Sequence, residues 1–229
     1  MTTLGIIGSG HIGSTVARLA IAAGLDVVLA NRRGPQTLTH LVEELGPQAR
    51  AATADEAARA GDLVVVSVPL RAIGDLPAAA LSGRTVLDTS NYYPLRDGHV
   101  AELDEASTTT AELVQRALPG AHVVKGFNNI FWGHLASLPR PAGSPDRSAL
   151  PIAGDDAGAK QQATELLDRL GYDVVDAGPL AEGWRFERDT PAYGAPYHAG
   201  DGPWTADSAH PADTATITAR LAEAERRGA

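Results

Sequence analysis

Three glycines near the start of the chain are spaced so that they could hold a phosphate. They follow an apolar run, Leu4–Ile7, that is typical of a strand, and they open a helical stretch, Ile12–Ala23. In such a G-x-G-x-x-G turn the first glycine permits a tight bend, the second lets the backbone approach a pyrophosphate, and the third lets helix pack on strand. The helix N-terminus adds free N–H groups and a positive dipole. We therefore predict a dinucleotide site, with a ligand-free glycine turn as the alternative. Its six residues are Gly8, Ser9, Gly10, His11, Ile12 and Gly13.

The end of the second predicted strand, Asp26–Ala30, indicates which dinucleotide is bound. A protein that binds NAD usually carries Asp or Glu there, which accepts hydrogen bonds from the ribose hydroxyls. This chain has Asn31, Arg32 and Arg33 instead. No carboxylate repels a 2′-phosphate, and guanidinium groups pair well with phosphate. The pattern favours NADP(H), and two solvated loop arginines are the alternative.

Other residues that could do chemistry have simpler interpretations. Asp155 and Asp156 come directly after a predicted strand, where a helix cap is a better explanation than a metal site. The seven histidines lack metal-ligand spacing, cysteine is absent, and there is no G-x-S-x-G elbow. Hydrolase chemistry, thiolate chemistry and cysteine-ligated metals therefore have no support.

Short apolar runs alternate with alanine-rich helical stretches along the chain. This alternation predicts an α/β fold with a Rossmann-type doubly wound parallel sheet. We place an NADP-binding core at residues 1–121 and an extension with a tail at 122–229. Helices are expected at Leu70–Ala80 and Thr214–Arg227, and residues 190–212 have no predicted regular structure.

Composition limits the class of protein further. The formal net charge is −9 and the basic residues are scattered, so a nucleic-acid partner is not expected. The first residues lack a basic region, and no apolar run is long enough to cross a bilayer. We expect a soluble cytoplasmic protein without a signal peptide or a membrane partner.

Several stretches together resemble the NADPH-dependent reductases of the deazaflavin coenzyme F420, whose fold also forms the cytosolic domain of metalloreductases. The similarity extends from residue 4 to about 194, and the late block is more specific than the glycine motif. The stretches are IIGSGHIGSTVARLA, ANRRGPQTL, VVSVP, HVVKGFNNI, LPIAGDDAGAKQQATELLDRLGYDVVDAGPL and ERDTPAYG.

The resemblance implies that the sheet carries a small C-terminal α/β extension that closes over the cofactor. It also implies direct hydride transfer between stacked nicotinamide and deazaflavin rings, without a catalytic protein side chain. It implies that Ser9 to Ile12 hold the pyrophosphate and that Asn31 and Arg32 hold the 2′-phosphate. Further cofactor contacts fall at Ser67, Val68, Pro69 and Asn91. Contacts to the second substrate fall at Asn128, Asn129, Phe131 and Trp132.

The identity of the acceptor stays open at this point. The Lys–x–Phe–Asn pattern at Lys125 is closer to the metalloreductase domain than to the deazaflavin reductases, which carry histidine in this stretch. A flavin, imine or carbonyl acceptor is one alternative, and a non-catalytic NADP-binding module is another. The family is often dimeric, so a homodimer is possible.

Arg32→Ala is expected to weaken NADPH binding strongly and to leave NADH binding almost unchanged, because NADH has no 2′-phosphate for the guanidinium to hold. A charge-assisted hydrogen bond contributes about 1.5–3 kcal/mol, which corresponds to roughly 10- to 100-fold in affinity. Calorimetric titration with each nucleotide measures the effect. Equal losses for both nucleotides would show that Arg32 does not recognise the phosphate.

Overall fold

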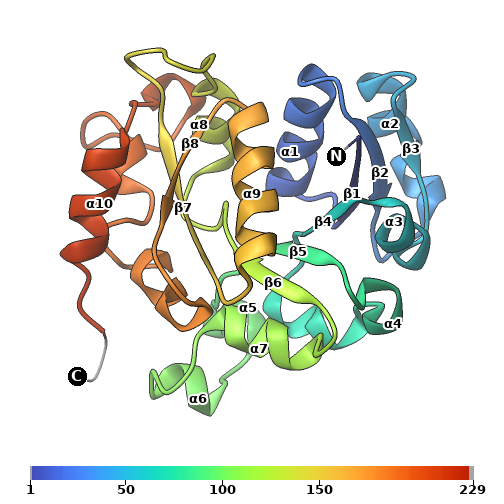
Figure 1. The fold of residues 1–229 in the computed structure, drawn as a ribbon, viewed down its shortest axis with the longest axis horizontal. Helices are drawn as coiled ribbons and strands as arrows, with labels where there is room; N and C mark the ends of the chain where they lie inside the picture. Colours follow the sequence, from blue (N-terminus) through green and yellow to red (C-terminus); the bar gives the residue numbers. More distant parts are fainter. Residues whose placement is uncertain (1, 227–229) are drawn as a thin grey trace.

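A computed structural model describes residues 2–226, in which eight strands form one sheet covered by helices (Figure 1). The strand order is β3-β2-β1-β4-β5-β6-β7-β8. Neighbouring strands run parallel except β6 and β7. The predicted doubly wound α/β class is therefore confirmed. The strands are β1 Thr3–Ile7, β2 Asp26–Ala30, β3 Ala49–Ala51, β4 Leu63–Val66, β5 Thr85–Asp88, β6 His122–Lys125, β7 Ala149–Gly154 and β8 Asp173–Asp176.

Helices cover the sheet through two apolar clusters. One cluster joins the strands to α1, α2, α8, α9 and α10, and the other joins them to α3, α4 and α7. The helices are α1 His11–Ala22, α2 Thr39–Leu45, α3 Ala54–Ala60, α4 Ala78–Leu81, α5 Pro94–Asp97, α6 Ala101–Asp104, α7 Thr110–Ala117, α8 Trp132–Ser137, α9 Ala157–Arg169 and α10 Thr214–Ala222. Shorter 3₁₀ turns are η1 Pro35–Leu38, η2 Leu70–Asp75, η3 Leu180–Phe186, η4 Ala195–Tyr197 and η5 Ala206–Ser208.

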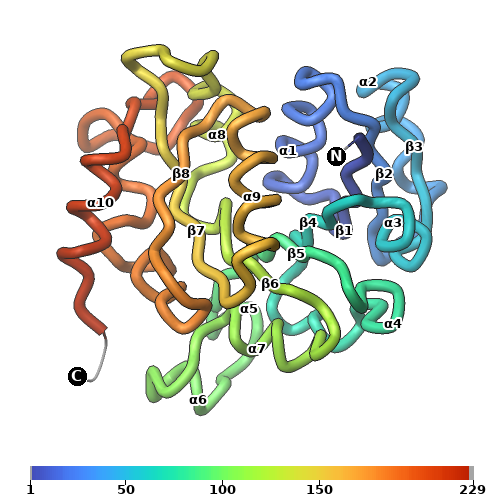
Figure 2. Tube along the Cα trace, viewed as in Figure 1, coloured from blue at the N-terminus to red at the C-terminus, as the bar shows by residue number. Residues whose placement is uncertain are grey.

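The parallel strands β1, β2, β4, β5 and β6 end at one border of the sheet, which we call the carboxyl edge. Strand β7 runs the opposite way, and only Ala153 and Gly154 pair with β6. The earlier residues of β7, and β8 beside them, therefore project past the carboxyl edge. Figure 2 shows the segment after β8, coloured orange to red, staying on this side of the molecule.

Two predicted helices differ from the structure. The helix expected at Leu70–Ala80 is wrong: the chain forms η2, then Pro77, then the short α4. Proline lacks an N–H group and clashes with the preceding turn, so one helix cannot run through this position. The last helix ends at Ala222, and Arg227, its predicted end, lies outside the described residues.

The position of the domain boundary at residue 122 stays a prediction. Strand β6 pairs in parallel with β5, so the change of strand direction falls after β6. One apolar cluster also draws on both halves of the chain, from Leu4 to Leu221. Among residues 2–226, no helix has the length and apolarity that crossing a bilayer requires.

Asp156 caps α9, as the sequence predicts, by accepting a hydrogen bond from the Ala159 N–H group at 2.7 Å. Its neighbour Asp155 accepts from the Leu180 N–H group at 2.8 Å and so ties η3 to the sheet. Within the described part of the chain, no cluster of three His, Asp or Glu side chains could hold a metal ion. Both carboxylates therefore have structural partners.

Asp156→Ala should lower the free energy of unfolding by about 1 kcal/mol, because the first turn of α9 loses its cap. Urea unfolding followed by circular dichroism measures this change. Asp156→Ser keeps an acceptor oxygen and should stay close to the parent. A loss of the same size in both variants would contradict the cap as the cause.

Candidate functional site

The turn between β1 and α1 can form only with glycine at its ends. Gly8 has φ of +114°, and a Cβ atom there would lie 2.0 Å from the Ser67 carbonyl oxygen. A Cβ on Gly13 would lie 1.9 Å from the Gly8 carbonyl oxygen. At Gly10, by contrast, a Cβ would meet no heavy atom within 4 Å. The outer glycines thus satisfy backbone contacts, while the middle one leaves open space beside the peptide plane.

The N-terminus of α1 faces this open space without a capping side chain. Gly10 is the N-cap residue, and the first turn contains no acidic residue. Helix N-termini leave up to four N–H groups without intrahelical partners, and α1 is twelve residues long, so the dipole adds to their attraction for an anion. The residues here fit the pyrophosphate of a dinucleotide. That His11 and Ile12 bind it stays a prediction.

The three polar residues of the loop after β2 have different roles. Asn31 Nδ2 donates to Ser9 Oγ at 3.2 Å and to Thr37 Oγ1 at 2.9 Å, and Asn31 Oδ1 accepts from the Arg33 N–H group. Asn31 therefore fixes this loop against the glycine turn, so its amide is occupied by protein groups. Arg32 and Arg33 are exposed, and no ion pair within residues 2–226 involves them. Their guanidinium groups are available to a phosphate.

The segment after β4 lies against the glycine turn. Ser67, Val68 and Pro69 are each half-buried, and the Ser67 N–H group donates to the Ile7 carbonyl oxygen at 2.8 Å. This contact extends the β1–β4 pairing to the carboxyl edge. These three residues therefore border the space that the glycines leave open.

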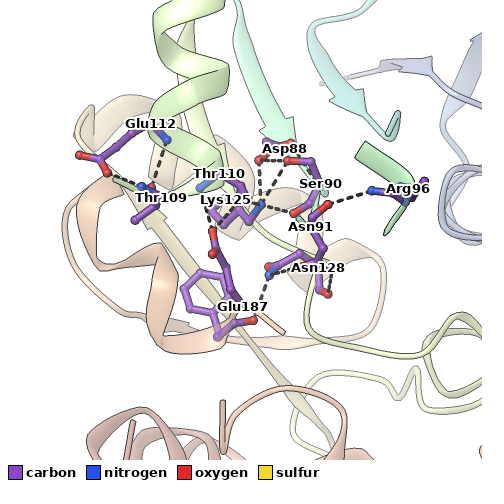
Figure 3. Close-up of polar contacts among 11 residues, drawn as sticks. Asp88, Ser90, Asn91, Arg96, Thr109, Thr110, Glu112, Lys125, Asn128 and Glu187 are labelled. Atoms are coloured by element: carbon purple, nitrogen blue, oxygen red, sulfur yellow. Dashed lines mark hydrogen bonds and ion pairs between the residues drawn. The ribbon is translucent and has the colours of Figure 1, made fainter. Parts of the chain in front are cut away.

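A buried ion pair joins the ends of β5 and β6 (Figure 3). The side chains of Lys125 and Asp88 are fully buried, and their Nζ and Oδ2 atoms lie 2.9 Å apart. Lys125 also donates to Thr110 Oγ1 at 2.8 Å and to the Ser90 carbonyl oxygen. All three ammonium protons have acceptors, so Lys125 clamps β5, β6 and α7 together.

The network continues into the C-terminal segment. Thr110 donates to Glu187 Oε1 through its hydroxyl at 2.5 Å and through its N–H group at 3.0 Å. Glu187 follows η3, so the chain of contacts runs from the sheet to the segment that covers its edge. The sequence analysis missed this cluster. The one sequence feature that could have indicated it is that Asp88 and Lys125, which have opposite charges, each end an apolar strand. In the structure these two strands are neighbours and the two residues are register partners.

The asparagines beyond β5 and β6 bind protein groups (Figure 3). Asn91 Nδ2 donates to the Asn128 carbonyl oxygen at 2.7 Å, and Asn128 Nδ2 donates to the Phe186 carbonyl oxygen at 2.9 Å. Asn129 is fully buried and donates to the Ala192 carbonyl oxygen at 2.9 Å. The structure brings Asn91 and Asn128 together at the carboxyl edge. The amides of Asn128 and Asn129 hold the C-terminal segment, and their contact with the second substrate stays a prediction.

Aromatic side chains lie beside the glycine turn. The indole of Trp132 stacks on the His11 imidazole, with ring centroids 4.9 Å apart and an angle of 14° between the planes. Phe131 packs against Trp132 at 5.2 Å, and Trp132 is 39% exposed. A flat apolar surface therefore adjoins the uncapped helix end, where the start of α8 meets the start of α1.

Comparison with known proteins agrees with this geometry. Residues 3–92 match the family described as NADP oxidoreductase, coenzyme F420-dependent. The rat metalloreductase STEAP3 is 28% identical over 180 residues, which are 78% of this chain and 34% of that protein. The chain thus spans about a third of this curated relative.

Two solved structures are similar along most of their length. A hypothetical protein from Sinorhizobium meliloti, SMa0349, is 32% identical with a TM-score of 0.74, over 84% of this chain and 93% of that chain. A candidate F420-dependent NADP reductase from Arthrobacter sp. FB24 is 25% identical with a TM-score of 0.66, over 79% and 86% of the two chains. The chain belongs to the family of coenzyme F420-dependent NADP oxidoreductases.

Proposed function

We propose that this chain transfers a hydride between NADP(H) and a deazaflavin of the coenzyme F420 type. The observation that carries the proposal is the pairing of an uncapped α1 N-terminus with the exposed Arg32. These groups can hold the pyrophosphate and the 2′-phosphate of one nucleotide. The family and the Arthrobacter structure support a deazaflavin as the second substrate.

When bound, NADPH would supply a hydride to the acceptor ring. A nitrogen of the acceptor ring would take one proton from water, so that the products are NADP⁺ and the reduced acceptor. The role of the protein is to position the two rings and to exclude competing reactions. We expect Ser67 to Pro69 and the Asn91–Asn128 pair to border the space beyond the glycine turn. Trp132 offers a flat surface beside it.

The buried ion pair at the ends of β5 and β6 is not available as a proton donor. Lys125 and Asp88 bind one another out of contact with solvent. The nearby Tyr93 and Tyr193 hydroxyls are hydrogen-bonded to each other at 3.0 Å. Burial, followed by the contact with Tyr93, raises the pKa of Tyr193, so its hydroxyl is a weaker acid than a free phenol. This arrangement suits hydride transfer to a ring that draws its proton from water.

Oxidised deazaflavin should be bleached when NADPH and the protein are added, and NADPH should be consumed in equal amount. Absorbance at the two chromophores measures both reactants, with FMN and a simple imine as comparison acceptors. Rapid turnover of FMN or the imine without turnover of deazaflavin contradicts the proposal. NADPH binding without turnover of any acceptor would instead favour a binding module.

Lys125→Met should lower the free energy of unfolding by about 3–5 kcal/mol, because Asp88 stays buried without its partner. The double variant Asp88→Leu, Lys125→Met removes both charges and should recover part of the loss. Urea unfolding compares the three proteins. If Lys125→Met unfolds like the parent but stops hydride transfer, Lys125 acts in catalysis and not as a clamp.

A further inference from the structure

Two exposed tryptophans contact the same phenyl ring near the carboxyl edge. The ring centroids of Trp132 and Trp204 lie 5.2 and 6.2 Å from that of Phe131. Trp132 is 39% exposed and Trp204 is 40% exposed. Within residues 2–226, Leu95 is the one other large apolar side chain that is exposed. Exposed apolar side chains that gather in one place mark a binding surface.

Aromatic rings continue from these tryptophans in two directions. Toward α1, Trp132 stacks on His11. Toward β5, Trp204 lies 6.4 Å from the ring of Tyr193, whose hydroxyl is bonded to that of Tyr93. The rings therefore span the carboxyl edge from the start of α1 to the segment after β5. This aromatic row comprises His11, Trp132, Phe131, Trp204, Tyr193 and Tyr93.

Trp204 belongs to a closed loop in the C-terminal segment. His198 and Ala209 form an antiparallel bridge, and the Ala199 N–H group donates to the Ser208 carbonyl oxygen at 2.8 Å. Residues 198–209, which we call the Trp204 loop, thus begin and end at the same place. Every residue from 199 to 207 is exposed. The loop has no apolar core of its own, so contacts at its base must hold it.

Ser208 fixes the base of the loop to α8. Its hydroxyl oxygen lies 3.1 Å from Nε2 of the fully buried His134 and 3.0 Å from Nδ1 of His198. His198 Nε2 donates to the Gly202 carbonyl oxygen at 3.0 Å. Both imidazoles are therefore engaged in holding the loop against α8.

The indole of Trp204 lies directly on the backbone at Gly194. Gly194 has φ of +71°, and a Cβ atom there would lie 2.0 Å from the indole Cη2 atom. The Gly194 N–H group donates to the Asn129 carbonyl oxygen at 2.8 Å, which joins this position to the loop after β6. The indole thus has a fixed place and an open surface. An exposed ring that is already fixed loses little conformational entropy when a ligand covers it.

The aromatic row extends toward the side of the sheet where the nicotinamide is expected. A nucleotide held by Arg32 after β2 and by the start of α1 after β1 has its 2′-phosphate and pyrophosphate placed. Strands β4, β5 and β6 lie on the other side of β1 from β2, so the remaining half of the nucleotide would extend toward their ends. Phe131 and Trp204 lie beyond the end of β6, next to that half.

We infer that the Trp204 indole contacts the conjugated ring system of the hydride acceptor and so determines which acceptors bind. The inference rests on the proposed function in that it assigns this surface to the acceptor. Stacking on an indole favours any flat conjugated ring and gains little from a small imine or carbonyl compound. Trp204 therefore selects for a deazaflavin or flavin ring through the ring itself.

The test measures the dissociation constant of 5-deazariboflavin, by quenching of its fluorescence, on the full chain saturated with NADP⁺. Trp204→Ala should weaken binding by about 10-fold or more, which is the usual effect of removing an aromatic stacking partner. Trp204→Phe keeps a flat ring and should retain most of the affinity. Trp184→Ala is the matched control, because Trp184 lies outside the aromatic row, beneath Arg185 at 4.6 Å, and it should bind like the parent. NADP⁺ affinity should stay the same in all three variants.

Hydrogen exchange on the parent chain gives a second measurement that needs no substitution. Adding 5-deazariboflavin to the NADP⁺-saturated protein should slow amide exchange at residues 199–207 and leave the segment around Trp184 unchanged. Unchanged exchange at 199–207 in the presence of bound compound contradicts the inference. It is also overturned if the parent binds no 5-deazariboflavin, if Trp204→Ala binds it like the parent, or if Trp184→Ala loses as much affinity. Sedimentation that shows a dimer in the parent and a monomer in Trp204→Ala would make the loop an interface between copies instead.

The inference and the proposed function can fail separately. Binding of 5-deazariboflavin that depends on Trp204, without oxidation of NADPH, supports the ring contact and contradicts the proposed function. Oxidation of NADPH by 5-deazariboflavin with the same Michaelis constant in the parent and in Trp204→Ala supports the proposed function and overturns the inference.

Discussion

The first turn of α1 has peptide N–H groups that no side chain caps, and the rest of the carboxyl edge is arranged around them. The turn that produces this helix end brings Gly8 against Ser67 and Gly13 against Gly8, with no room for a Cβ atom at either glycine. Asn31 then ties the loop after β2 to Ser9, so that loop is placed relative to the same turn. A negatively charged group at the helix end would satisfy these donors, and phosphate is the anion that the fold suits.

A second constraint is the buried ammonium group of Lys125. A buried charge is tolerated only with close partners, and here it holds Asp88, Ser90 and Thr110 in one place. Thr110 in turn donates a hydrogen bond to Glu187. Asn128 and Asn129 donate to the carbonyl groups of Phe186 and Ala192. The C-terminal segment is thereby held over the carboxyl edge by polar contacts whose donors lie on or beside the parallel sheet.

The strands and the glycine turn could be predicted because apolar runs and glycine spacing are local features. The helix at Leu70–Ala80 was wrong because Pro77 outweighs the apolar pattern. The contact between Thr110 and Glu187 could not be predicted, since it joins residues 77 positions apart in the sequence that meet only in the folded chain. The part that Asn128 and Asn129 play in holding the C-terminal segment could not be predicted either. An amide suits a ligand and a backbone carbonyl equally well, and only the fold shows that Phe186 and Ala192 take these donors.

A crystal structure of the chain with NADP⁺ tests the central claim most directly. The account predicts the pyrophosphate oxygens within hydrogen-bond distance of the His11 and Ile12 N–H groups, and the 2′-phosphate paired with Arg32. A nucleotide bound with its pyrophosphate away from the start of α1, or with its 2′-phosphate out of reach of Arg32, would contradict it.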